Sequence, residues 1–128
     1  LIALRHRLPP LRPPAFLHGG TVLRPGLNDI AWFDQHGHAM TPEAWNEPEA
    51  RTLALRRAMA AADGGVDVIL LLLNADGAGH AFALPQPRLD WMLVLDSAHP
   101  DMPERPVLDE AVPVAPRSVV LLAAQVPP

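Results

Sequence analysis

Cysteine and lysine are both absent from this chain of 128 residues. Without cysteine the chain can form neither a disulfide framework nor a thiolate metal site, which fits a reducing compartment. All ten basic residues are arginine, and the net charge of −4 argues against a nucleic-acid partner. No apolar run is longer than the six residues of Val68–Leu73, whereas a membrane-spanning helix needs about 20. We therefore expect a cytoplasmic protein with no membrane segment and no nucleic-acid partner.

The first residues indicate a helix and not a secretory signal. Arginines interrupt the apolar positions of this segment, which is unlike a signal peptide. Leu1, Leu4 and Leu8 repeat at helical spacing, and Pro9 and Pro10 are expected to end the helix. No capping residue stands before Leu1, so we expect the chain to be a piece of a longer protein that begins inside a helix.

Short apolar segments separated by turn residues dominate the rest of the chain. Five segments are expected as strands: 29–34, 66–74, 80–85, 89–96 and 117–126. The segment 51–60 fits a strand by its alternating leucines and a helix by its alanine and arginine content, so both stay open. Because 49% of the residues are hydrophobic, the chain can bury one core, and the pattern predicts a mostly β chain with an antiparallel β-sandwich.

The connections between these segments carry their own signals. Thr41 is expected to cap a short helix whose first residue is Pro42. We expect strands 66–74 and 80–85 to pair as a hairpin. Residues 97–116 contain five prolines and four acidic residues and are expected to form a long irregular loop.

The order of the motifs is more specific than any one of them. It reads "LIALRHRLPPL", "FLHG", "DIAWFDQHGHAMTPEAW", "DVILLLLNA", "FALP", "W", "LDSA" and "RSVVLL". This order resembles the C-terminal end of bacterial glycogen debranching enzymes of the isoamylase type, in the alpha-amylase superfamily, over nearly the whole chain. In that family an all-β domain follows a catalytic (β/α)8 barrel.

The resemblance implies a domain organisation and a function. Residues 1–18 would be the end of the last barrel helix and a connector, and residues 19–128 would be the C-terminal β-sandwich domain. The parent protein would hydrolyse α-1,6-glucosidic branch linkages in glycogen or limit dextrin. The domain would cover and stabilise the catalytic barrel, its partner in the parent chain, and the separated chain would self-associate through the apolar surface thus exposed.

The resemblance assigns no site residue to this chain. The catalytic aspartates and glutamate of the family lie on barrel strands that would precede Leu1, and none of the 14 acidic residues matches their motifs. We therefore expect no catalytic, cofactor-binding or metal-binding residue, no cofactor, and no catalysis by this chain alone. The chain departs from the family at His36, where an aspartate usually precedes the glycine; Gly37 still supplies the positive φ that the turn requires.

Two other functions stay open. The chain could be a carbohydrate-binding module for α-glucans, which needs exposed aromatic rings on one sheet face. It could also be the C-terminal domain of a related hydrolase that forms trehalose from maltodextrins. The motif Asp29–Trp45 favours the debranching type.

The aromatic residues have two interpretations. Trp32, Phe33 and Trp45 can pack at the seam between the β-domain and the barrel, or they can stack on sugar rings. Their place in the motif order favours the seam. Trp91 alternates with leucines and is expected in the core.

The polar candidates also have competing interpretations. His36 and His38, with Asp34 and His80, could ligate zinc, but they flank a glycine and favour a solvated turn. Asp29, Asp34, Glu43 and Glu47 could supply a carboxylate pair for glycoside hydrolysis, but acidic residues in a turn-rich segment favour solvated or capping roles.

The remaining polar and glycine residues are expected in structural or solvated roles. These are Asp67 and Arg117 at strand ends, Asn74 and Asp76 in a turn, Gly77 and Gly79 at a hairpin tip, and Asp101, Glu104, Asp109 and Glu110 in a mobile loop with no regular calcium-ligand spacing.

Overall fold

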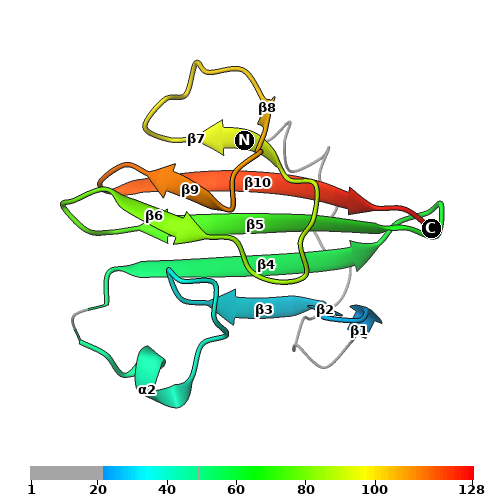
Figure 1. Cartoon of the computed structure of the whole chain (residues 1–128), viewed down its shortest axis with the longest axis horizontal. Helices are drawn as coiled ribbons and strands as arrows, with labels where there is room; N and C mark the ends of the chain where they lie inside the picture. The colour runs from blue at the N-terminus through cyan, green and yellow to red at the C-terminus, as the bar shows by residue number, and fades with distance from the viewer. Residues whose placement is uncertain (1–21, 49) are drawn as a thin grey trace.

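The computed structural model describes residues 22–48 and 50–128, and most of its regular elements are strands (Figure 1). Within these residues the elements are β1 (Val22–Arg24), β2 (Leu27–Asn28), β3 (Ile30–Phe33), α2 (Pro42–Trp45), β4 (Thr52–Ala60), β5 (Val66–Asn74), β6 (His80–Ala83), β7 (Met92–Asp96), β8 (Arg105–Pro106), β9 (Ala111–Val114) and β10 (Ser118–Val126). The strands pair in antiparallel fashion. The predicted class, mostly β with antiparallel sheets, is confirmed. The predicted helix and connector at 1–18 lie outside the described residues.

One large sheet organises the molecule. Its strand order is β3-β4-β5-β10-β7-β8, and its centre is formed by the three long strands β4, β5 and β10 (Figure 1). β4 and β5 form a hairpin through Gly64 and Gly65, and β10 pairs with the other edge of β5 along its whole length. The segment 51–60 is therefore a strand. The helical interpretation of this segment was wrong. Successive side chains of β4 point to opposite faces of the sheet, and the residues on one of these faces are buried.

A second layer covers one face of this sheet. β6 and β9 pair with each other and lie in front of β5 and β10 in Figure 1. Phe82, Val112 and Val114 from this pair join one buried cluster with Leu70 and Leu122 of the large sheet. We call this side of the large sheet the inner face. It holds the main core of the protein.

Two predicted connections are corrected by this layer. β5 and β6 do not pair, because the turn after Asn74 carries the chain out of the large sheet into the second one. Residues 97–116 are not one irregular loop, because they contain β8 and β9. In β9 the alternate residues Val112 and Val114 point into the core while Pro113 stays exposed, as proline is tolerated in a strand outside the sheet centre.

The inner face also buries one arginine. Arg56 is only 3% exposed, and its guanidinium lies 4.9 Å from the ring centroid of Phe33. Its two terminal nitrogens donate to the carbonyl oxygens of Gln86 (2.9 Å) and Gly26 (2.8 Å). Burial lowers the pKa of Arg56. This residue ties two loops to the sheet, and sequence reasoning missed it; the only signal was an arginine at an inward position of an alternating strand.

The core prediction for Trp91 is confirmed, since its side chain is 2% exposed and belongs to the main cluster. Among the described residues no helix has the length and apolar character needed to cross a bilayer.

Candidate interaction surface

The segment Asp29–Trp45 brings two tryptophans together. After β3 the chain turns, and Thr41 caps α2 by accepting a hydrogen bond from the backbone N–H of Ala44 at 3.1 Å. The predicted cap and the position of Pro42 are confirmed. α2 then places the indole of Trp45 edge-on to that of Trp32, with 5.5 Å between ring centroids. Trp45 remains 52% exposed.

The third aromatic residue of this segment lies elsewhere. Phe33 is buried on the inner face, under the guanidinium of Arg56. Successive side chains of a strand point to opposite faces, so Trp32 and Phe33 cannot act in one cluster. Of the three aromatic residues expected to pack together at the seam, Trp32 and Trp45 are in contact and Phe33 lies in the core.

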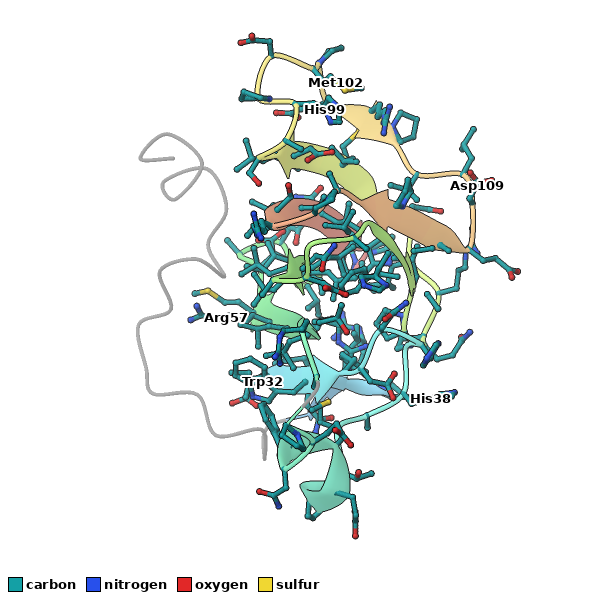
Figure 2. The ribbon with its side chains drawn as sticks, turned by 90° about the vertical axis from the view of Figure 1, so that its left-hand side faces the viewer. Trp32, His38, Arg57, His99, Met102 and Asp109 are labelled. Carbon is teal, nitrogen blue, oxygen red and sulfur yellow. The ribbon has the colours of Figure 1, made fainter. Side chains whose placement is uncertain are left out.

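The second face of the large sheet is mainly apolar. We call it the outer face, and its residues follow from strand register: Ile30, Trp32, Leu53, Leu55, Arg57, Met59, Asp67, Ile69, Leu71, Leu73, Val94, Leu95, Val119, Leu121, Ala123 and Gln125. One row crosses five strands as Trp32–Leu55–Leu71–Leu121–Leu95. In Figure 2, Trp32 and Arg57 lie on this side and His38 and Asp109 on the opposite side.

The covering of the two faces differs. β6 and β9 cover the inner face, and among the described residues no strand covers the outer face. Ile69 and Leu121 are buried by their neighbours, but Trp32, Leu55 and Leu71 are only half-buried. Such a contiguous apolar surface is typical of an interaction site.

A shallow hollow extends the outer face toward α2. Its volume is about 340 Å³, and its walls include Met40, Trp45, Leu53 and Leu73. The walls are mainly apolar, and Glu47, Arg51 and Thr52 contribute polar groups. The hollow suits an apolar side chain of a partner better than a charged ligand.

The histidine pair forms a solvated turn, as the sequence favoured. One carboxylate oxygen of Asp34 accepts the backbone N–H groups of His36 (2.8 Å) and His38 (3.0 Å), and Gly37 has a φ of +80°. His80 pairs with Asp76 and does not join them. In the described part of the chain, no three or more His, Cys, Asp or Glu side chains come together to hold a metal.

The four acidic candidates occupy separate roles. Asp29 is buried and accepts the backbone N–H of Ile30 at 2.9 Å. Asp34 organises the turn just described. Glu43 lies in the first turn of α2, and Glu47 lines the hollow beside Trp45.

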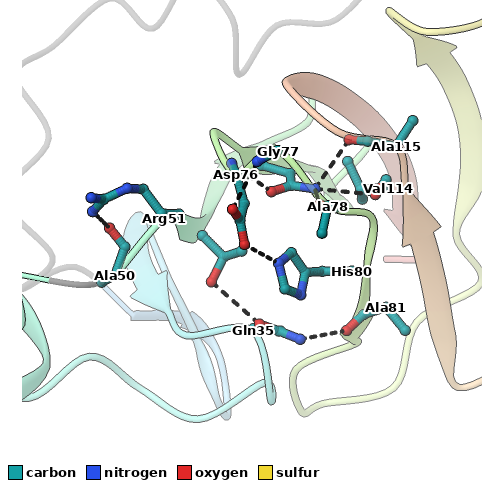
Figure 3. A network of polar contacts seen from close by, with 12 residues as sticks. Gln35, Ala50, Arg51, Asp76, Gly77, Ala78, His80, Ala81, Val114 and Ala115 are labelled. Carbon is teal, nitrogen blue, oxygen red and sulfur yellow. Dashed lines mark hydrogen bonds and ion pairs between the residues drawn. The ribbon is translucent and has the colours of Figure 1, made fainter.

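The turn after β5 contains a polar network (Figure 3). The Nδ2 amide of Asn74 donates to the carbonyl oxygens of Ala78 (3.0 Å), Val114 (3.2 Å) and Ala115 (3.1 Å), and its Oδ1 accepts the N–H of Asp76 at 3.0 Å. Asn74 is a turn former, as predicted, but it also links the large sheet to β9. Gly77 and Gly79 lie in this connection between sheets and not at a hairpin tip.

The remaining candidates lie at the periphery. Asp67 accepts the side-chain amide of Gln125 at 3.1 Å, and Arg117 turns the chain into β10 with a φ of +50°. The acidic residues of 97–116 are exposed. His99 lies 3.3 Å from a carboxylate oxygen of Asp96 at a separate groove.

The contact between Asp76 and His80 leads to a prediction about the pKa of Asp76. The hydrogen bond from His80 Nε2, 2.7 Å from Oδ2 of Asp76, is the main cause that lowers the pKa of that carboxyl, and the N–H of Gly77 lowers it further. The resulting stabilisation is present above the unfolded pKa of about 3.9 and is lost as pH falls through the lowered folded value. His80→Ala should raise the pKa of Asp76 toward its ordinary value, as read from an NMR titration of the carboxyl. His99→Ala is the control and should leave it in place; an unchanged pKa in His80→Ala would contradict the assignment.

Comparison with models of known protein families and with curated proteins finds no match to this sequence.

Proposed function

We propose that this chain is the C-terminal accessory domain of a glycogen debranching enzyme, and that its outer face docks against the catalytic barrel of the parent protein. The single observation that supports docking is the apolar outer face, which is extended by the Trp32–Trp45 pair. The motif order described above supplies the debranching assignment. On this proposal the parent is a cytoplasmic hydrolase of α-1,6 branch linkages, and this domain stabilises it.

The physical basis of the proposed role is burial of apolar surface. Each square ångström of apolar surface removed from water contributes about 25 cal/mol, before the costs of association are subtracted. A face that crosses five strands offers a broad contact, and the hollow beside Trp45 offers a place for one protruding side chain.

Complementation tests this proposal. Hydrolysis of a branched dextrin is measured with the chain alone, with the barrel portion of the parent alone, and with both. We expect no hydrolysis by the chain alone and a gain of activity when it is added to the barrel. Hydrolysis by these 128 residues alone would contradict the proposal, and release of trehalose from maltodextrins would favour the related trehalose-forming enzymes.

A carbohydrate-binding module is the second candidate. The observation that favours it is the half-exposed indole of Trp45 beside the hollow. Stacking of a sugar on this ring would quench or shift the tryptophan fluorescence of the chain when maltodextrin is added, and Trp45→Ala would abolish the change. On the docking proposal maltodextrin leaves the fluorescence unchanged.

A further inference from the structure

Arg57 is a charged residue within the apolar outer face. By strand register it lies in the row Ile30–Arg57–Ile69–Ala123. Its side chain is half-buried, and its Nε is buried with no hydrogen-bond partner among the described residues. None of the ion pairs between described residues includes it. Burial lowers the pKa of Arg57.

The neighbouring Arg56 is buried within this chain, and its surroundings can be compared with those of Arg57. The Nε of Arg56 is also buried without a hydrogen-bond partner, but carbonyl oxygens accept from its two terminal nitrogens and the ring of Phe33 lies against its guanidinium. On the outer face the described residues provide Arg57 with no such acceptor. Asp67, a carboxylate of this face, lies in the neighbouring row Met59–Asp67–Gln125 and accepts a hydrogen bond from Gln125.

A guanidinium remains charged in proteins, so covering it with apolar surface alone would be costly. A surface that docks here must therefore supply an acceptor to Arg57. A carboxylate suits this position best, because its two oxygens match the guanidinium fork and its charge neutralises the cation.

We propose that the partner surface covering the outer face presents an aspartate or glutamate carboxylate to Arg57, inside an otherwise apolar contact. This inference rests on the proposed function, in which the catalytic barrel is that partner. The carboxylate fixes the register of docking, since a broad apolar face alone permits many registers.

The first test asks whether the charge of Arg57 contributes to docking. Calorimetry measures binding of the chain to the separate barrel portion of the parent. Arg57→Met keeps an unbranched apolar stem and removes the guanidinium with its charge, and it should weaken binding at least about 30-fold by leaving the carboxylate unpaired. Arg88→Met is the matched control, because Arg88 is exposed and lies beside Glu110 on the other side of the molecule. It should leave the dissociation constant unchanged.

The absence of lysine permits a direct test of the carboxylate. Arg57→Lys introduces a lysine amine into a chain that has no other. A carbodiimide can join that amine to a carboxylate in contact: an amide bond forms between Nζ and the carboxyl carbon, and the carbodiimide takes up the oxygen as a urea. Mass spectrometry should then find the introduced amine of the Arg57→Lys variant linked to an aspartate or glutamate of the barrel, whereas Arg88→Lys should give no such link.

The outcomes separate this inference from the proposed function. If the wild-type chain binds the barrel but Arg57→Met binds equally well, or if the bound Arg57→Lys complex gives no crosslink, the carboxylate is excluded and the docking role stands. If the wild-type chain does not bind the barrel, the docking role fails and this inference fails with it.

Discussion

Replacing Asn74 with leucine is expected to lower the free energy of unfolding by about 3 kcal/mol, because several polar groups lose their partner at once. The side chain is 3% exposed, and leucine has the same number and branching of side-chain heavy atoms, so the change removes hydrogen bonds without removing side-chain atoms. The carbonyl oxygens of Val114 and Ala115 would be left without their amide donor. Since these bonds join the turn after β5 to β9, the second layer should loosen first. Urea unfolding measures the loss, and hydrogen exchange locates it.

Asn46→Leu is the matched control for this prediction. Asn46 is exposed, and its side-chain amide makes one hydrogen bond, to the carbonyl oxygen of Pro42 at 2.9 Å. Water can replace that bond, so the same substitution there should cost less than about 1 kcal/mol. If both substitutions lowered the free energy of unfolding equally, the hydrogen bonds of Asn74 between the two layers would contribute no more to stability than an exposed hydrogen bond.

The isolated chain is expected to self-associate through its outer face, and the double variant Leu55→Gln with Leu71→Gln is expected to be monomeric. The two leucines are directly opposite each other on β4 and β5, in the row that crosses five strands. Both are half-buried, so glutamine can reach water from either position. Two polar side chains in the middle of the face remove much of the gain from apolar contact. Sedimentation velocity measures the assembly state, and circular dichroism verifies that the double variant remains folded.

Leu108→Gln provides the control for the outer face. Leu108 is 83% exposed and lies between β8 and β9, far along the chain from β4 and β5. It should leave the assembly state unchanged. A wild-type chain that is strictly monomeric and binds no apolar dye would count against an outer face that requires a partner.

Local patterns predicted the elements whose causes are local. Short apolar segments bounded by turn residues identified β3, β5, β7 and β10, and Thr41 followed by Pro42 identified the start of α2. The turn at Gly37 needed only a glycine that accepts a positive φ. Trp91 was placed in the core because large aromatic residues in an alternating strand are usually buried.

The partners of the strands could not be predicted in the same way. β6 resembles the second strand of a hairpin with β5, but it pairs with β9, which follows it by more than two dozen residues. An apolar strand is compatible with many partners, and its choice depends on side chains that are distant in sequence. The prolines of 97–116 hid β8 and β9 for a related reason, since a proline excludes a strand only where its missing N–H is needed.

The sequence by itself determined a mostly β chain without cysteine or lysine, the turn at Gly37 and the start of α2, and its motif order is the basis of the debranching proposal. The tertiary structure decided which side of each strand meets the second layer. Arg56 and Arg57 are adjacent and identical in chemistry, yet one is held in the core and the other faces outward. Because side chains alternate across a strand, that difference depends only on the register of β4 between β3 and β5, which distant residues set.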